Sequence, residues 1–393
     1  MLDTSVAPWP SYSEEETQAV ANVLRSGRVN QWTGKEVCTF EDEFATFCDA
    51  NHAVAVANGT LALDLALRAL DIGPGDEVVV TPRTFIASVS SVVLAGAKPV
   101  FADVERDSGN ISPRTIEPVL SERTRAIVPV HLGGWPCDMP GIMQLASKHS
   151  LAVIEDCAQA HGARIDGRMV GSFGDVGAWS FCQDKIMTTA GEGGMVVCND
   201  EDLRQRMWSF KDHGKSWDAV FERRHPPGFR WLHEDFGTNW RMLEIQAAVG
   251  RIQLRRMGDW SARRRAIAAR YRATLQPFVN GVRTPEAPDG YDHACYRFYA
   301  YVRAEALRPG WSRDRIVEAV TGRGVPLFQG SCSEVYLEKA FDGTPFRPPN
   351  RLPNAQELGE TSLMFLTHPT LSDDDVDRIC DAVAATLDEA VER

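Results

Sequence analysis

The sequence lacks paired cysteines: its nine cysteines lie singly along 393 residues, and no Cys-x-x-Cys occurs. An odd, dispersed set argues against a disulfide framework and favours reduced thiols in the cytoplasm. The nine histidines show no metal-ligand spacing either, so we expect no metal site. Residues 1–6 lack the basic and apolar segments of a signal peptide, so none is expected.

The chain also lacks a long basic run and a long apolar run. Its net charge is −12 and its pI is about 5.3, so we expect no binding to nucleic acid. The short basic cluster 263–265 is predicted to form the solvated face of a helix. The apolar stretch 85–97 is short and broken by serines, which predicts a buried helix rather than a membrane span.

Strand-like and helix-like segments alternate from residue 52 onward. The predicted strands are 52–57, 77–80, 99–102, 126–130, 151–154, 177–181 and 194–197. The predicted helices are 39–48, 61–70, 84–95, 113–120, 140–149 and 200–213. Continuous apolar strands joined by helices indicate a mainly parallel sheet that is covered by helices on both faces. The predicted fold class is therefore α/β.

Helices flank this alternating region on both sides. A capping-box pattern at Ser13 and a stop at Gly27 predict a helix between them. Helices dominate again from 242 to about 275. We predict a large domain over residues 1–255, with the N-terminal segment included, and a small C-terminal domain over 256–393. The elements predicted in the small domain are a strand at 298–302 and helices at 313–321 and 373–390.

The segment 214–237 has no clear period and carries prolines, aromatic residues and charges. A loop of this length in a compact protein is usually functional, interfacial or disordered. No internal repeat or low-complexity tract occurs in the chain.

Ligands of an open α/β sheet gather at the carboxyl ends of its strands, and three candidate segments lie at such ends. The first is Asn58-Gly59-Thr60, where a strand gives way to a helix. Gly59 lets a phosphate group approach the backbone, and the helix N-terminus supplies free N–H groups and a positive dipole. The same residues are common at ordinary turns, so this segment alone decides nothing.

Asp156 and Gln159 form the second candidate segment. Asp156 ends an apolar strand, where an unpaired carboxylate is costly to remove from water. It therefore needs a cationic or proton-donating partner. That partner is either an ordinary ion pair within the protein or the protonated heterocycle of a bound ligand.

Ser180 and Lys185 form the third candidate segment. Ser180 leaves a strand as a candidate hydroxyl donor, and Lys185 follows in a loop before the run Gly191-Glu192-Gly193-Gly194. A lysine drawn from water and placed near other cations has a lowered amine pKa, which makes the amine a nucleophile towards a carbonyl. A lysine that merely faces solvent is the ordinary alternative.

These segments meet the chemical needs of pyridoxal phosphate. The cofactor requires an amine for its aldehyde, a carboxylate for its ring nitrogen and a cradle for its phosphate group. It also needs a flat wall against its ring, which Phe85 could supply just after the strand at 77–80. Simple packing at the start of the next helix is the alternative role of Phe85.

Several motifs follow one another in a fixed order along the chain. They are Asn58-Gly59-Thr60, Thr81-Pro82-Arg83-Thr84-Phe85, Glu155-Asp156-Cys157-Ala158-Gln159-Ala160-His161-Gly162, Ser180-Phe181 to Lys185, Gly191-Glu192-Gly193-Gly194 and Gly237-Thr238-Asn239-Trp240-Arg241-Met242. In this order they resemble the DegT/DnrJ family of sugar aminotransferases, over most of the chain and most densely from 50 to 250. The resemblance implies a fold-type I pyridoxal-phosphate enzyme, in which helices sandwich a mainly parallel mixed sheet and a smaller C-terminal α/β domain follows.

The resemblance also implies a role for each candidate residue. Lys185 would form the Schiff base with pyridoxal 5'-phosphate, which cycles through pyridoxamine 5'-phosphate during turnover. Asp156 would pair with the ring nitrogen. Gln159 would bond the ring hydroxyl, and Phe85 would cover the ring.

The phosphate group would be held by residues of two subunits. By resemblance, Gly59, Thr60 and Ser180 would bind it from one chain, and Asn239 would reach it from the neighbouring chain. A site shared in this way makes a homodimer the smallest working unit. The segment 214–237 would then lie near the shared site.

The family implies transfer of an amino group from glutamate, or from glutamine, to a keto-sugar. A nucleotide-linked 3- or 4-keto-6-deoxy sugar of polysaccharide or secondary-metabolite biosynthesis is the expected acceptor. Residues 327–334, followed by Val335-Tyr336, stand where many members carry a tyrosine- or histidine-containing motif of the sugar pocket. This departure leaves the acceptor open, and an inosose, the cyclic ketone of aminocyclitol pathways, stays open as well.

Three other functions fit parts of the sequence. A pyridoxal-phosphate sugar dehydratase shares the fold but has a histidine in place of the lysine, so Lys185 argues against it. A catalytically idle regulator would have no need of the complete set of cofactor motifs. A nicotinamide dehydrogenase would need Gly-x-Gly-x-x-Gly after the first strand, and none occurs there.

Overall fold

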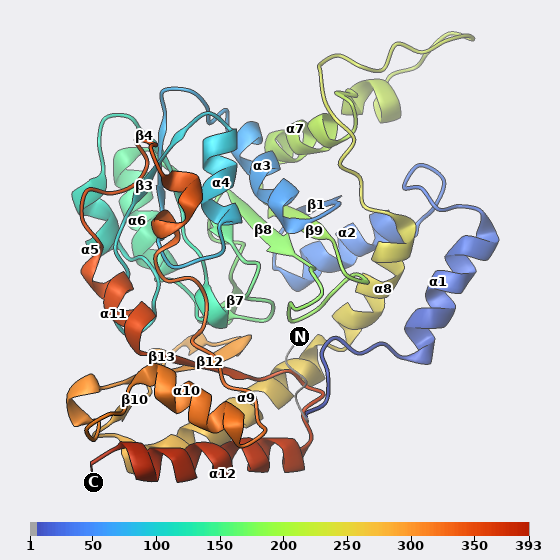
Figure 1. The fold of residues 1–393 in the computed structure, drawn as a ribbon. Coiled ribbons are helices and arrows are strands. Elements are labelled where there is room, and N and C mark those ends of the chain that lie inside the picture. Colours follow the sequence, from blue (N-terminus) through green and yellow to red (C-terminus); the bar gives the residue numbers. More distant parts are fainter. Residues whose placement is uncertain (1–5, 393) are drawn as a thin grey trace.

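The computed structural model describes residues 6–392 (Figure 1). The helices are α1 (Glu14–Ser26), α2 (Glu36–Phe47), α3 (Gly59–Ala69), α4 (Ala87–Leu94), α5 (Pro113–Ile116), α6 (Met139–His149), α7 (Glu201–Lys211), α8 (Glu244–Arg255), α9 (Met257–Leu275), α10 (Arg313–Gly322), α11 (Pro353–Thr361) and α12 (Asp373–Ala390). The strands are β1 (His52–Val56), β2 (Glu77–Val80), β3 (Lys98–Phe101), β4 (Thr124–Val128), β5 (Ala152–Asp156), β6 (Arg164–Ile165), β7 (Arg168–Met169), β8 (Val176–Ser180), β9 (Gly194–Cys198), β10 (Val282–Arg283), β11 (Tyr291–Asp292), β12 (Arg297–Val302) and β13 (Ser362–Leu366).

A seven-stranded sheet forms the centre of the molecule, in the order β1-β9-β8-β5-β4-β2-β3. β9 runs antiparallel to both of its neighbours, and the other neighbouring pairs are parallel. The antiparallel step arises because β8 and β9 are joined by a loop without a helix, as the sequence predicted. The predicted α/β class with a mainly parallel mixed sheet is confirmed.

Both faces of this sheet are buried. Val78 and Val80 join a core with residues of α3, α4 and α7, whereas Val79 joins a second core with residues of α6 and α11. Successive side chains of a strand point to opposite faces, so a strand covered on both sides must be apolar throughout. This is why β2 was predicted at its observed bounds.

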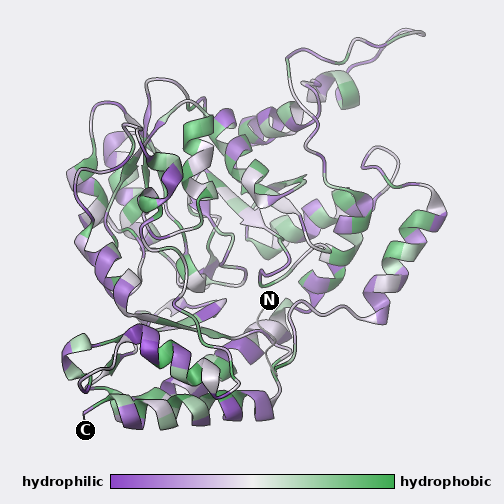
Figure 2. Cartoon of the chain, viewed as in Figure 1, coloured by the Kyte–Doolittle hydropathy of each residue, from purple (hydrophilic) through white to green (hydrophobic). Residues whose placement is uncertain are grey.

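β10, β12 and β13 form a smaller antiparallel sheet. Its residues pack with α9, α10 and α12 in a separate core that contains Phe298, Leu363 and Ile379. Figure 2 shows hydrophobic and polar residues alternating along α12, as expected of a helix with one buried face. Of these elements, β12, α10 and α12 were predicted, and β13 with the preceding α11 was not. The domain division at residues 255 and 256 stays a prediction.

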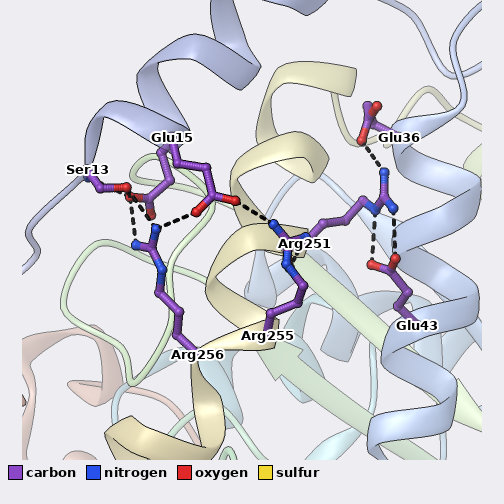
Figure 3. A network of polar contacts seen from close by, with 8 residues as sticks. Ser13, Glu15, Glu36, Glu43, Arg251, Arg255 and Arg256 are labelled. Carbon is purple, nitrogen blue, oxygen red and sulfur yellow. Dashed lines mark hydrogen bonds and ion pairs between the residues drawn. The ribbon is translucent and has the colours of Figure 1, made fainter.

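α1 packs along α8, and charged side chains join the two helices (Figure 3). Arg256 donates to Ser13 and Glu15, and Arg255 donates to Glu15 as well. The predicted capping box at Ser13 and the stop at Gly27 are confirmed. The N-terminal helix is therefore anchored to the helix that begins the second half of the chain.

The segment 214–237 projects from the body as an arm, drawn in yellow-green in Figure 1. It contains a π-helical turn, Asp218–Glu222, and is otherwise largely irregular, as its lack of period predicted. Phe229, Trp231 and Phe236 on this arm are 80%, 81% and 91% exposed. The arm therefore exposes three large aromatic side chains to solvent.

Two local predictions were wrong. The cluster 263–265 was expected to face solvent, yet Arg264 on α9 is fully buried, with its guanidinium carbon 5.4 Å from the centre of the Trp9 ring. The helix expected at 84–95 begins only at Ala87, so Phe85 lies in the turn before α4. Within residues 6–392, no helix combines the length and the apolar composition that a bilayer crossing needs.

Candidate active site

The carboxyl ends of β5 and β8 lie side by side and carry two of the predicted site residues. Asp156 ends β5, Ser180 ends β8, and these strands are parallel neighbours. Lys185 lies in the loop that leads from β8 to β9. The structure thus brings Asp156, Ser180 and Lys185 to one edge of the sheet.

Asp156 is buried and accepts two hydrogen bonds. Ser88 Oγ donates to its Oδ2 at 2.7 Å, and the Ala158 N–H donates to its Oδ1 at 3.1 Å. Thr84 Oγ1 lies 2.8 Å from Ser88 Oγ and extends this chain of hydroxyl groups. Burial raises the pKa of Asp156, and its two bonds and the charge of Lys185 offset burial only in part. A further cationic partner would therefore stabilise this carboxylate.

Glu155 precedes Asp156 in β5, and its carboxylate accepts four hydrogen bonds. The N–H groups of Gly171, Phe173 and Gly174 donate to its carboxylate at 2.8, 2.7 and 2.7 Å. His131 Nε2 donates at 3.1 Å, because the other ring nitrogen accepts a backbone N–H bond. These donors use the acceptor capacity of Glu155, so it holds neighbouring loops rather than a ligand.

Contacts from distant parts of the chain hold the loop that carries Lys185. Trp9 Nε1 donates to the Lys185 carbonyl at 2.8 Å. Gln253 on α8 accepts the Thr188 N–H at 2.8 Å and donates to Glu16 on α1 at 2.9 Å. The backbone from which the amine projects is therefore fixed by the N-terminal segment and by α8.

The amine of Lys185 faces a carboxylate and a phenol. Its Nζ lies 3.6 Å from Asp184 Oδ1 and 5.4 Å from the centre of the Tyr296 ring. Burial lowers the pKa of Lys185, but the acidic groups around the amine, Asp184 and Asp156 among them, together outweigh burial, and the net pKa is raised. The predicted lowering of this pKa was wrong, because the groups nearest the amine are acidic rather than cationic.

Asp184 is itself held in place. Tyr296 Oη donates to Asp184 Oδ2 at 2.6 Å, and Arg297 Nη2 lies 3.9 Å from the same oxygen. Burial raises the pKa of Asp184, but Lys185, the Tyr296 bond and Arg297 outweigh it, and the pKa is lowered. Sequence analysis missed Asp184 and Tyr296. Asp184 could have been noticed as the residue before Lys185, whereas no local pattern marks Tyr296.

The N-terminus of α3 offers backbone N–H groups to an anion. Asn58 caps this helix, and its Oδ1 accepts the Leu61 N–H at 3.0 Å. The N–H groups of Gly59 and Thr60 precede that bond and lie in the first turn, where helices leave such groups unpaired. A Cβ at Gly59 would lie 2.5 Å from Ser180 Cβ, so a side chain there would displace Ser180. The three residues predicted to hold phosphate are thus neighbours.

The remaining predicted residues surround this group. Gln159 is buried, and its Oε1 accepts the Gly133 N–H at 2.7 Å. Phe85 is 68% exposed in the turn before α4. Asn239 is exposed at the base of the arm, where its backbone forms an isolated β-bridge with that of Asp212. Exposure of Phe85 and Asn239 leaves both free to meet a ligand or a second chain.

The segment 327–334, expected near the sugar pocket, is tied to the rest of the molecule. Ser333 Oγ accepts a bond from Arg83 Nη1 at 3.0 Å, and the guanidinium carbon of Arg83 lies 5.2 Å from the centre of the Tyr299 ring. A Cβ at Gly133 would lie 3.0 Å from the same ring. A chain of contacts through Arg83, Tyr299 and Gly133 therefore connects this segment to Gln159.

The residues present fit pyridoxal phosphate. A buried carboxylate with a raised pKa suits a protonated ring nitrogen, and the space between α3 and β8 admits only glycine, as a phosphate cradle requires. Lys185 supplies a primary amine from the loop that follows β8. The chemistry available to this arrangement is covalent attachment of an aldehyde and transfer of protons by the freed amine.

Comparison with known proteins identifies the family. The model of the DegT/DnrJ/EryC1/StrS aminotransferase family matches residues 10–384. The chain belongs to this family. The resemblance drawn from the motifs is confirmed, and the protein is an enzyme of a pyridoxal-phosphate-dependent aminotransferase family.

Two curated relatives match nearly the whole chain. The spore coat polysaccharide biosynthesis protein SpsC of Bacillus subtilis is 38% identical over 381 residues and covers 95% of each chain. The dTDP-3-amino-3,4,6-trideoxy-alpha-D-glucose transaminase of Streptomyces venezuelae is 37% identical over 387 residues, which cover 98% of this chain and 96% of the relative.

Two solved structures share the fold over almost their full length. An aminotransferase from Psychrobacter cryohalolentis is 57% identical, with a TM-score of 0.97, and covers 98% of this chain and 99% of its own. The PMP form of Spr1654 from Streptococcus pneumoniae is 25% identical, with a TM-score of 0.87, and covers the same shares of the two chains. These likenesses extend beyond the central sheet to the C-terminal elements.

Proposed function

We propose that this enzyme uses pyridoxal 5'-phosphate to move an amino group from glutamate or glutamine to a nucleotide-linked keto-sugar. The observation that carries the proposal is the joint placement of Asp156, Ser180 and Lys185 at one edge of the sheet. The relative named as a dTDP-amino-sugar transaminase supports the class of acceptor. A 3- or 4-keto-6-deoxy sugar of polysaccharide or secondary-metabolite biosynthesis is the acceptor we propose, in keeping with the polysaccharide relative.

Each residue has a task in this proposal. Lys185 binds the cofactor aldehyde through its amine, and Asp156 keeps the ring nitrogen protonated. When bound, the ring supplies an electron sink for a carbanion at the carbon that carries the amino group. Gln159 holds the ring hydroxyl through the amide nitrogen that its bond to Gly133 leaves available. Phe85 covers one face of the ring.

The protein's part in the chemistry is proton transfer. When free, the Lys185 amine would take a proton from the donor carbon that bears nitrogen and would later return it to the carbon on the other side of that nitrogen. Asp156 stays ionised throughout because a protonated nitrogen faces it. Thr84 and Ser88 keep the Asp156 carboxylate pointed towards the edge of the sheet.

The phosphate group is held by Gly59, Thr60 and Ser180, and by Asn239 of a neighbouring copy. The exposed aromatic side chains of the arm support this homodimer, since they need a covering surface. The arm and Asn239 belong to one continuous segment, so an arm that docks on a second copy carries Asn239 with it.

The free cysteines support a cytoplasmic location for this enzyme. All nine are unpaired thiols, as the reducing cytoplasm favours.

Incubation of the purified enzyme with pyridoxal phosphate, glutamate and keto-sugars linked to dTDP, UDP or GDP tests this function. The proposal expects an amino-sugar product from one of them. Amination of scyllo-inosose alone would place the enzyme with the aminocyclitol pathways. A deoxy-sugar product would instead support the dehydratase, and no half-reaction with any amino donor would support an idle regulator.

Lys185→Ala is the matching variant. It should lose covalent attachment of the cofactor and at least about 10³-fold in transamination rate. Lys148→Ala is the control, because Lys148 is exposed and pairs with Glu117 on the surface. A Lys185→Ala enzyme that transaminates at the wild-type rate would refute the proposal.

A further inference from the structure

Asp184 is the carboxylate nearest to the amine of Lys185, and neither the family motifs nor the proposed function gives it a task. Its Oδ1 lies 3.6 Å from Lys185 Nζ. Its side chain is 48% exposed, and an aspartate that open to water usually moves freely. Here its other oxygen accepts a 2.6 Å bond from the Oη of Tyr296, a residue that is 5% exposed. The carboxylate is therefore fixed from one side and faces the amine from the other.

Arg297 completes the clamp on this carboxylate. Its guanidinium stacks 4.1 Å from the centre of the Tyr296 ring, and its Nη2 lies 3.9 Å from Asp184 Oδ2. Arg297 begins β12, and Asp184 lies in the loop after β8, so the contact joins the small sheet to the lysine loop. A residue that only balanced charge on the surface would not need a buried phenol and an arginine from another sheet.

The other titratable groups that face Lys185 do not replace Asp184. Burial raises the pKa of Tyr296, which keeps the proton that it donates to Asp184. Burial also raises the pKa of Cys182. His161 stays neutral, because burial and the nearby cations lower its pKa to about 3. Asp156 belongs to the ring nitrogen in the proposed function, so Asp184 is the anion left for the amine.

We propose that Asp184, clamped by Tyr296 and Arg297, is a positioning residue that stabilises the ammonium formed when the free amine of Lys185 takes up a proton. The proposal rests on the proposed function, in which Lys185 alternates between the bound and the free state. Asp184 does not touch the substrate carbon. It acts through Lys185, by stabilising the charged form that carries the proton.

The proton balance is simple. The free amine takes one proton from carbon and becomes an ammonium, and the electron pair of the broken C–H bond would pass to the cofactor ring, the electron sink of the proposed function. The ammonium would then give the proton to the carbon on the other side of the nitrogen, where the same electron pair forms the new C–H bond, and return to the neutral amine. Asp184 remains a carboxylate and Tyr296 remains a phenol at every point, so no further reactant is needed.

Competitive labelling of the cofactor-free protein with acetic anhydride measures the first part of this proposal. The acetylation of Lys185 is followed by mass spectrometry from about pH 7 to 11. In Asp184→Asn the midpoint of labelling should fall by about one pH unit, because the ammonium loses its counter-charge. Tyr296→Phe should give a smaller shift in the same direction. Glu192→Gln is the matched control, since it removes a carboxylate from the same loop and should leave the midpoint unchanged.

The pH dependence of kcat measures the second part. In Asp184→Asn the acidic limb of the kcat profile should move to lower pH, and the plateau should fall about tenfold, the equivalent of one pKa unit. An unchanged labelling midpoint would overturn the proposal. A shifted midpoint with an unshifted kcat profile would also overturn it, because Asp184 would then be an ion-pair partner with no part in turnover. If Lys185 never binds the cofactor, the labelling shift survives while the proposed function fails.

Discussion

Glu155 and Asp156 are neighbours in β5 and are both buried, yet they meet opposite surroundings. Glu155 accepts bonds from three backbone N–H groups and from His131, all supplied by its own chain. Asp156 accepts one hydroxyl bond and one backbone bond, and burial raises its pKa. Because successive strand residues point to opposite faces, one side chain enters the protein and the other enters the site.

The contrast teaches how to tell a structural carboxylate from a functional one. Both are costly to bury, and the protein offsets this cost completely only for Glu155. The unbalanced residue is the one that needs a partner from outside the chain. We therefore expect Asp156 to matter for catalysis and Glu155 to matter for stability. A single substitution at each position tests this difference.

The largest expected effect is on catalysis, in Asp156→Asn. An amide cannot hold a proton on the ring nitrogen as a carboxylate can, so the rate of transamination should fall by about 10²–10³-fold. The variant should fold and be at least as stable as the wild type, because it loses a carboxylate that burial opposes. Steady-state kinetics and a melting curve check both halves, and a folded variant with wild-type kcat would remove Asp156 from the mechanism.

Glu155→Gln should show the reverse pattern. Its amide group brings N–H donors into a place where backbone N–H groups already point, so bonds are lost and a buried polar mismatch is created. The free energy of unfolding should fall by about 3 kcal/mol. Urea titration measures this loss. If Glu155→Gln proves as stable as the wild type, the structural role assigned to Glu155 is wrong.

The pH dependence of stability sharpens the comparison further. Because folding raises the pKa of Asp156, its contribution to stability is present in acid and is lost as the pH rises through the folded pKa. In cofactor-free protein, Asp156→Asn should therefore gain unfolding free energy relative to wild type over the range above about pH 4, the ordinary pKa of an aspartate. Urea titrations across that range check the sign, and a difference that shrinks with pH would contradict it.

The smallest expected effect comes from Trp9→Phe, which removes the bond to the Lys185 carbonyl and keeps most of the ring. The free energy of unfolding should fall by about 1 kcal/mol, and kcat should fall by less than about tenfold. Trp260→Phe is the control, since the Trp260 ring packs 5.1 Å from the ring of Trp9. Equal effects of the two variants on kcat would mean that packing, rather than the bond to the lysine loop, matters here.

Local patterns predicted those parts of the fold whose causes are local. The β-branched run of β2 predicted its bounds, and Ser13 and Gly27 marked the ends of α1. Arg264 was misplaced because its burial against Trp9 depends on a segment far away in the chain. β13 was missed because it follows α11 directly, with no turn residue to separate helix from strand.

The same division holds in the site. Asp156 and Ser180 were found because strand ends can be located from the sequence, and Lys185 because it precedes a glycine-rich loop. Ser88 and Tyr296 contact these residues only because the tertiary fold brings distant segments together, so no spacing in the sequence predicts their roles. The direction of the Lys185 pKa shift was wrong for this reason, since it depends on which charges the fold places beside the amine.

The central claim is that Lys185 is the covalent anchor of the cofactor. Reduction of the holoenzyme with borohydride, followed by proteolysis and mass spectrometry, locates the attachment directly. The account predicts one phosphopyridoxyl group per chain, on the peptide that contains Lys185. A group on any other lysine, or none at all in an active enzyme, would contradict it.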